Sequence, residues 1–326
     1  MKAIFCSVKA RAEPCRDGCD DNARAGHWTN AKEFVTKVLL GRLLKYSLVI
    51  VCLFAVSAAG TRAVVASSGE PLILAVHPYL PASDLLTRFT PLATYLSRAL
   101  GRPVAVRVGR SYAEHISAIG EDAVDIAYMG PAAYVKMYDH FGPKPLLARQ
   151  EVNSQIYLRG VIIVRQDSGI RDLSELKGKR FAYGDRDSTM SHVVPRHVLL
   201  RAGITPVMLA QQGFLGSHNN VVLAVLSGDY DAGAIKEEVF QQQAHKGLRV
   251  LATLPPIADH NFVASNRLSP TIVDTLRHSL WRLKDSAEGR AIMNSLHPQM
   301  SALVPAWDSD YNSLRTLLGK PARPHD

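Results

Sequence analysis

The chain has 326 residues, of which 47% are hydrophobic and 21% are charged, and its formal net charge is +9. This composition is typical of a globular protein with a sizeable core, and the length suggests two domains. More than half of the net positive charge lies within residues 1–66, and no run of Lys and Arg with interleaved aromatic residues occurs. The charge pattern therefore argues against a nucleic-acid-binding protein.

The N-terminal end is typical of an export signal. Basic residues precede an apolar run over residues 46–59, and small residues follow the run. The run is short for a membrane span and suits the apolar region of a signal peptide. We therefore expect residues 1–66 to form an N-terminal tail and a cleavable signal, and the protein to be periplasmic. An uncleaved membrane anchor is the alternative interpretation.

Cysteine usage agrees with an exported protein that lacks thiol chemistry. All four cysteines precede Ala66, so the exported part would contain neither a thiol nor a disulfide. The spacing of Cys15 and Cys19 does not suit a structural metal site, and no pair of histidines accompanies them. The sequence therefore predicts no metal and no cofactor.

From residue 72 onward, short apolar runs alternate with amphipathic segments. Continuous apolar runs predict strands that are buried on both faces, and apolar residues three and four apart predict helices. In the first half the predicted elements are strand 72–76, a helix capped by Ser83 or Asp84 that ends at Leu100, strand 104–108, helix 112–119, strand 124–128, helix 132–140 and strand 144–148.

The same alternation continues in the second half. The predicted elements are strand 156–164 with an interruption at Arg159 and Gly160, helix 173–176, strand 180–183, a helix ending at Ala202, strand 206–211, a helix ending at Leu226, strand 231–235, helix 237–245, strand 248–254, strand 260–265 and helices 270–282, 286–294 and 308–318. Alternation of this kind predicts an α/β fold with mostly parallel sheets that carry helices on both faces. Ligands of such sheets bind beyond the carboxyl ends of the strands.

A polar turn connects one predicted strand to the helix that follows it. Residues 184–195 read Gly-Asp-Arg-Asp-Ser-Thr-Met-Ser-His-Val-Val-Pro. The first turn of a helix leaves backbone N–H groups unpaired at the positive end of the helix dipole. With the hydroxyls of Ser188, Thr189 and Ser191, these groups favour binding of a tetrahedral oxyanion, and His192 could add a charge-assisted bond. An ordinary capped helix is the alternative interpretation.

Short motifs occur in a characteristic order along residues 72–318. They are Leu74-Ala-Val-His-Pro-Tyr79, Pro91-Leu-Ala-x-Tyr-Leu96, Val124-Asp-Ile-Ala-Tyr-Met-Gly-Pro-x-x-Tyr134, Leu176-Lys-Gly-Lys-Arg-Phe-Ala182, Asp187-Ser-Thr-Met-Ser-x-x-x-Pro195 and Asp231-Ala-Gly-Ala-Ile235. Taken together, the set resembles the periplasmic solute-binding proteins of ABC importers for phosphonate, phosphite and phosphate.

The resemblance implies a type II periplasmic-binding fold. In that fold two lobes are joined by two crossing strands, and the ligand binds in the cleft between the lobes. Lobe one would comprise residues 70–157 and 261–318, and lobe two residues 160–258. The crossings would fall near Gly160 and near Phe262.

The resemblance also implies a ligand site and a partner. The expected ligand is a phosphonate, phosphite or phosphate, the expected partner is a membrane permease, and the protein is expected to be a monomer. The oxyanion contacts of the family correspond to Ser188, Thr189 and Ser191, whereas His192 departs from the commoner glycine-containing form. The aromatic and polar residues of the family's cleft correspond to Tyr79, Tyr128, His218 and Asp231.

Two other function classes were weighed against import. A sensor would use the same cleft and signal to a membrane receptor or kinase, and the sequence does not separate the two roles. An enzyme is disfavoured, because the sequence has no nucleophile elbow, no phosphate-binding Walker loop and no zinc-binding His-Glu-x-x-His motif. Ser191 and His192 are adjacent on a predicted helix and point about 100° apart, so they cannot form a nucleophile–base pair.

Overall fold

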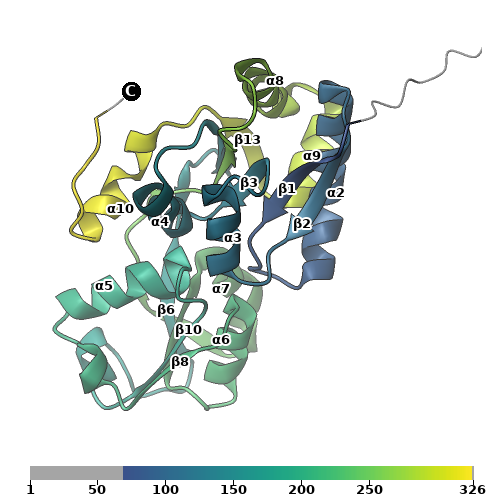
Figure 1. Cartoon of the computed structure of the whole chain (residues 1–326). Helices are drawn as coiled ribbons and strands as arrows, with labels where there is room; N and C mark the ends of the chain where they lie inside the picture. Colours follow the sequence, from purple (N-terminus) through teal and green to yellow (C-terminus); the bar gives the residue numbers. More distant parts are fainter. Residues whose placement is uncertain (1–68, 325–326) are drawn as a thin grey trace, which may run out of the picture. The chain divides into compact units, whose positions relative to one another are not determined.

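A computed structural model describes residues 69–324 of the chain (Figure 1). The predicted N-terminal tail and signal, residues 1–66, lie outside the described residues. Within residues 69–324, none of the helices is long and apolar enough to cross a membrane. The described chain forms two main sheets, one two-stranded sheet and the helices that pack on them.

The first sheet has the strand order β13-β4-β12-β3-β1-β2. Its strands are β1 (Leu72–Val76), β2 (Val104–Val108), β3 (Ile126–Met129), β4 (Leu146–Val152), β12 (Asn261–Ala264) and β13 (Met300–Val304). Strand β1 pairs in parallel with β2 and β3, whereas β12 runs antiparallel to β3 and to β4. Because β12 is antiparallel to β3, its first residue, Asn261, lies beside Met129 at the edge where β1 and β3 end.

The second sheet has the order β10-β6-β9-β7-β8. Its strands are β6 (Gly160–Arg165), β7 (Arg180–Tyr183), β8 (Gln211–Phe214), β9 (Ala232–Lys236) and β10 (Leu248–Thr253). Strand β7 pairs in parallel with β8 and β9, and β6 runs antiparallel to β9 and β10. The carboxyl ends of β7 and β9 therefore lie at one edge of this sheet.

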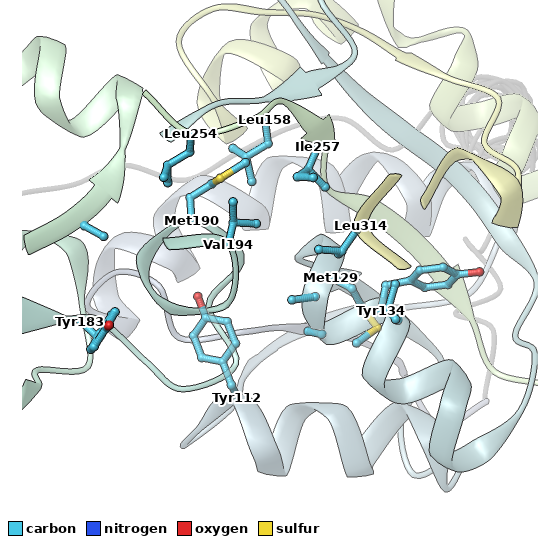
Figure 2. Packing of buried hydrophobic residues seen from close by; sticks show 14 of the residues in the cluster. Tyr112, Met129, Tyr134, Leu158, Tyr183, Met190, Val194, Leu254, Ile257 and Leu314 are labelled. Carbon is cyan, nitrogen blue, oxygen red and sulfur yellow. The ribbon is translucent and has the colours of Figure 1, made fainter. Parts of the chain in front are cut away.

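The chain passes from one main sheet to the other twice. Next to these passages, β5 (Tyr157–Leu158) and β11 (Ile257–Ala258) pair antiparallel and form the two-stranded sheet. The buried side chains of Leu158, Leu254 and Ile257 contact Met190 and its neighbours in one apolar cluster, as Figure 2 shows. That cluster also contains residues of both main sheets, so it packs the two halves together around the passages.

The helices cover the sheets through apolar faces. They are α2 (Ala82–Leu100), α3 (Tyr112–Gly120), α4 (Pro131–Phe141), α5 (Val194–Arg201), α6 (His218–Leu226), α7 (Glu237–Gln243), α8 (Pro270–Trp281), α9 (Ala287–Leu296) and α10 (Asn312–Leu317). Helix α2 shows the pattern most clearly, because Leu85, Phe89, Leu92 and Leu96 recur at helical spacing and are all buried. It ends at Gly101, whose φ of 60° lies in the left-handed region that favours glycine.

Short helical turns complete the described secondary structure. They are η1 (Leu173–Leu176), the π-helix η2 (Thr189–Val193), η3 (Pro206–Met208), η4 (Ala244–Lys246), η5 (Leu283–Asp285) and η6 (Asp308–Tyr311). The π-helix η2 continues directly into α5, so one helical segment runs over residues 189–201.

The predicted α/β fold is confirmed, and four details of the prediction are wrong. The sheets are mixed instead of mostly parallel, because β12 is antiparallel to β3 and β6 is antiparallel to β9. Residues 206–208 form a turn and the strand begins at Gln211, since Pro206 has no N–H for a strand. Strand β13 was not predicted. Helix α2 begins after Pro81 without a side-chain cap, so neither Ser83 nor Asp84 caps it.

The core around β12 gives the first prediction. Phe262 is 0% exposed in a central strand, so Phe262→Ala should lower the free energy of unfolding by about 3–5 kcal/mol. Val207 is 91% exposed, and Val207→Ala is the matched control that should change it by less than about 0.5 kcal/mol. Denaturant unfolding of both variants measures the difference, and equal losses would contradict this placement of the core.

Candidate functional site

Five aromatic and imidazole rings gather where β1 and β3 end and β12 begins. We call His77, Tyr79, Tyr112, Tyr128 and His260 the ring cluster. The His77 ring centroid lies 4.9 Å from that of Tyr79, 4.9 Å from that of Tyr112 and 5.4 Å from that of His260, and the Tyr128 and His260 centroids are 5.1 Å apart. The cluster arises because β12 is antiparallel to β3, which places His260 beside the carboxyl end of β3.

The histidines of the ring cluster are neutral and have defined tautomers. His77 Nδ1 lies 3.1 Å from the Tyr128 carbonyl oxygen, and His260 Nδ1 lies 2.8 Å from an Asp259 carboxylate oxygen. Both oxygens only accept, so each Nδ1 carries the proton and each Nε2 keeps a lone pair. Burial, with the nearby charge of Lys236, lowers the pKa of His260 to about 4, and burial and the neighbouring His260 lower the pKa of His77.

The second sheet contributes the start of the helical segment 189–201. Ser188 occupies the N-cap position, but its side chain makes no capping hydrogen bond. It interacts instead with the Tyr112 hydroxyl. The Thr189 hydroxyl oxygen accepts a hydrogen bond from the Ala132 backbone N–H at 2.9 Å. Because Ala132 lies in the first turn of α4, the starts of two helices meet at this bond.

Gly130, directly before α4, shows how closely the two halves approach. A Cβ atom at this position would lie 3.6 Å from His260 Nε2 and 3.8 Å from Thr189 Oγ1. The ring cluster and the helix start at Thr189 therefore border the same small space. A longer side chain at position 130 would project into that space, and glycine leaves it open.

His218 and Lys236 complete the site from the second sheet. His218 is the first residue of α6, where Ser217 caps the helix by accepting from the Asn220 N–H. The Lys236 backbone N–H donates to His218 Nδ1 at 3.3 Å, so the proton of the neutral ring is on Nε2. Burial, with the charge of Lys236, lowers the pKa of His218 to about 3. The Lys236 ammonium lies 5.1 Å from the centroid of the Tyr79 ring.

A polar cavity of about 190 Å³ lies beside Lys236. Its lining includes Gln150, which accepts from the Tyr128 hydroxyl at 2.6 Å, and it includes Asp259 and His297. Side chains of both sheets line this cavity, and they include basic groups, Lys236 and Arg159, as well as the carboxylates of Glu237, Glu238 and Asp259. Ser188, Thr189 and His218 are not part of this lining, so the cavity adjoins Lys236 and is distinct from the helix start.

Comparison with known proteins places the chain in a family. The sequence model for the periplasmic phosphonate substrate-binding proteins of ABC transporters matches residues 74–311. The chain belongs to this family. The family that the motifs resemble is thereby confirmed, and members of it are periplasmic binding components of transporters.

Two curated relatives show the extent of the similarity. A phosphate-import protein PhnD from Mycolicibacterium smegmatis is 25% identical over 76% of this chain and 84% of its own length. A probable phosphite-binding protein PhnD1 of an ABC transporter from Prochlorococcus marinus is 25% identical over 56% of this chain and 65% of its own length.

Solved structures of the family share the fold. The binding protein of an ABC phosphonate transporter from Pseudomonas aeruginosa superposes with a TM-score of 0.69 at 23% identity, covering 77% of this chain and 86% of that chain. PhnD1 from Prochlorococcus marinus, solved with methylphosphonate, gives 0.69 at 21% identity, covering 77% of this chain and 99% of that chain. The α/β fold expected from the family resemblance is therefore present.

The structure brings together five of the eight residues that were expected at the ligand site of this family member. Tyr79 and Tyr128 lie in the ring cluster, and Ser188, Thr189 and His218 face it from the second sheet. Their assignment as ligand contacts stays a prediction.

Ser191 lies directly behind this site and has its own partners. Its side chain is 0% exposed, its hydroxyl donates to the Ala234 carbonyl at 2.5 Å, and it accepts from the Gly184 N–H at 2.8 Å. Ser191 therefore ties the polar turn to β9 and fixes the position of the helix start. Its hydroxyl proton is used within the protein.

His192 and Asp231 lie away from the ring cluster. His192 Nδ1 lies 2.6 Å from the Arg186 carbonyl oxygen, and its ring packs edge-on against Tyr183 and Phe214. Asp231 precedes β9, at the opposite end of the strand from Lys236, and forms an ion pair with Arg180 at 2.8 Å. Both side chains thus have partners within the second sheet, and the ligand roles expected for them gain no support from their positions.

Four residues of the site were not predicted: His77, Tyr112, His260 and Lys236. Lys236 could have been found, because it directly follows the predicted strand 231–235 and so lies at a carboxyl end. His260 could not, since its position depends on the antiparallel insertion of β12.

Buried neutral histidines make the stability of the protein sensitive to acid. In the folded state the pKa values of His115 and His260 are about 4 and that of His218 is about 3, against about 6.5 in an unfolded chain. The unfolded state therefore binds more protons below pH 6.5, so stability should fall as the pH falls from about 6.5 toward 4. Thermal melts of the exported fragment across that range measure the loss, and a melting temperature that stays constant would contradict it.

A substitution of Ser191 tests whether this side chain stabilises the fold or contacts the ligand. Ser191→Ala would leave the buried Gly184 N–H and Ala234 carbonyl without this partner, which should cost about 1–3 kcal/mol of stability. Ser227→Ala, at an exposed position, is the control and should cost less than about 0.5 kcal/mol. Chemical denaturation compares the two, and a neutral Ser191→Ala would contradict the supporting role.

Proposed function

We propose that this substrate-binding protein captures a small phosphorus oxyanion, namely phosphate, phosphite or an alkylphosphonate, between its two sheets and delivers it to a membrane permease. The observation that carries the proposal is the meeting of two helix starts at the Thr189–Ala132 hydrogen bond, opposite the ring cluster and Lys236. In this proposal residues 70–157 and 261–318 form one lobe and residues 160–258 the other.

The electrostatics of the helix starts favour a negative ligand. Each helix carries the equivalent of a partial positive charge at its N-terminus, and the first N–H groups have no partner inside the helix. At this site the starts of α4 and of the segment 189–201 are adjacent, and the Lys236 ammonium adds a full charge. An oxyanion held there would accept bonds from N–H groups, from the Ser188 and Thr189 hydroxyls and from His218 Nε2.

The neutral histidines suit a ligand that keeps a proton on oxygen. His260 Nε2 retains a lone pair and lies on the Gly130 side of the site. A protonated oxygen of a phosphate or phosphonate monoanion could donate to that lone pair, whereas the remaining oxygens would accept from the donors opposite. The names of the relatives agree with ligands of this class, since they include a phosphate-import protein and a probable phosphite-binding protein.

Two contacts between the sheets, an ion pair and a histidine–carboxylate contact, support closure around the ligand. Lys136 of α4 contacts Asp187 of the polar turn at 2.7 Å, and His297, after α9, contacts Glu238 of α7 at 2.7 Å. Each pair joins residues that belong to different proposed lobes. The Lys136–Asp187 pair is partly exposed, and exposed pairs contribute about 1 kcal/mol or less, which would allow the lobes to reopen and release the ligand.

The oxyanion proposal is tested by removing two hydroxyls. Ser188→Ala combined with Thr189→Ala should weaken binding of methylphosphonate and phosphate by about 3–6 kcal/mol in total, because hydrogen bonds to a charged group contribute about 1.5–3 kcal/mol each. Isothermal titration calorimetry of the exported fragment measures the affinities.

The matched control is Ser227→Ala combined with Thr275→Ala, since both hydroxyls are exposed and lie in other helices or turns. Circular dichroism melts show that each variant is folded before titration. If the Ser188/Thr189 variant binds as tightly as the control, the anion site lies elsewhere.

A further inference from the structure

Gly130 is a buried glycine whose place in the chain does not require glycine. It directly precedes α4 and has φ −71° and ψ 153°, an extended backbone conformation that any residue adopts. A Cβ atom added to it would lie at least 3.6 Å from every atom beyond its two neighbours in the chain, which is ordinary van der Waals contact. Neither the backbone conformation nor the packing of the free protein therefore excludes alanine at position 130.

Helix capping does not account for this glycine either. Ser, Thr, Asp and Asn are favoured directly before a helix, because their side chains accept hydrogen bonds from the first N–H groups. Gly130 has no side chain, and the Ala132 N–H donates instead to the hydroxyl of Thr189 from the second sheet. Within residues 69–324 the Ala133 N–H has no hydrogen-bond partner. A polar side chain at position 130 would therefore cap α4 better than glycine does.

The space that Gly130 leaves empty lies between an acceptor and a donor. The added Cβ atom would be 3.6 Å from His260 Nε2 and 3.8 Å from Thr189 Oγ1. His260 is 3% exposed, and its Nδ1 donates to Asp259, so the buried Nε2 is an acceptor. The Thr189 oxygen accepts from Ala132, which leaves the hydroxyl proton available to donate.

These two polar groups need partners that the protein does not supply. Within the part of the chain that the structure describes, neither His260 Nε2 nor the Thr189 hydroxyl proton takes part in a hydrogen bond. Burial of a polar group without a partner is costly. The pair therefore points to a bound molecule that both donates and accepts hydrogen bonds next to Gly130.

We propose that Gly130 determines the size of the ligand: the bound oxyanion fills the space in which a side chain of residue 130 would lie. The inference rests on the proposed function, because it assumes that the oxyanion contacts Thr189. A phosphorus oxyanion that keeps one proton offers both the donor and the acceptors that the two polar groups require. A methyl group on residue 130 would contact both groups and take volume from a ligand between them.

The experiment adds only that methyl group and compares ligands of different size. By titration calorimetry, Gly130→Ala should bind phosphate and methylphosphonate at least about tenfold more weakly than wild type, because extra volume in a close-packed site is strongly unfavourable. Phosphite has a hydrogen in place of one oxygen of phosphate, so it should lose about threefold or less. The variant should therefore prefer phosphite over phosphate more strongly than wild type does.

Gly169→Ala is the matched control. Gly169 is exposed, its φ lies outside the left-handed region, and no atom lies within 4 Å of an added Cβ atom. This variant should bind all three ligands as wild type does.

The stability of the ligand-free protein provides a readout that a glycine with a purely structural role would not give. Gly130→Ala should leave the melting temperature unchanged or raise it, because alanine fits the native backbone conformation and restricts the unfolded chain. A clear fall in the melting temperature, or a variant that does not fold, would show that the free protein needs glycine there and would overturn the inference.

Failure of this inference is distinguishable from failure of the proposed function. If Gly130→Ala binds phosphate and methylphosphonate as tightly as wild type, or loses affinity equally for all three ligands, residue 130 does not limit ligand size and the proposed function stands. If wild type binds none of the three ligands, the proposed function itself fails.

Discussion

The hydrogen bond from the Ala132 N–H to the Thr189 hydroxyl is the contact on which the site depends. It joins the first turns of two helices that belong to different sheets, and it places their positive ends next to each other. The positive ends of two helices and the charge of Lys236 repel one another, so electrostatics alone would oppose this arrangement. The surrounding structure holds the two helix starts together through the apolar cluster at Met190. The contacts of Lys136 with Asp187 and of Glu238 with His297 have the same effect.

In the proposed site the two sheets supply different groups. The second sheet supplies donors, namely hydroxyls, an imidazole N–H and an ammonium. The first sheet supplies ring faces and the lone pair of His260 Nε2. In the proposed site neither half is complete, because Thr189 and His260 come from different sheets and both approach Gly130. The proposed function therefore depends on both halves.

Local sequence patterns predicted the strands that precede the site and the helix that follows Ser188, because buried strands and helix starts have short-range signals. The family resemblance pointed to Tyr79, Tyr128 and His218, which lie at the carboxyl ends of strands or at a helix start. Neither the patterns nor the resemblance predicted His260, since its neighbours come from a strand about 130 residues earlier and from an antiparallel insertion. The resemblance also pointed to Asp231, which lies at the amino end of β9 and pairs with Arg180, so its assignment as a ligand contact stays a prediction.

The two-stranded sheet of β5 and β11 has a consequence for how ligand exchange proceeds. Each strand has two residues, so the pair forms a narrow ribbon next to both passages of the chain. A ribbon of this kind bends readily across its width but resists sliding along its length, since sliding breaks its backbone pairing. In the proposed function, the halves would open by a swing about this ribbon, and such a swing would break the hydrogen bond between Thr189 and Ala132 that joins them.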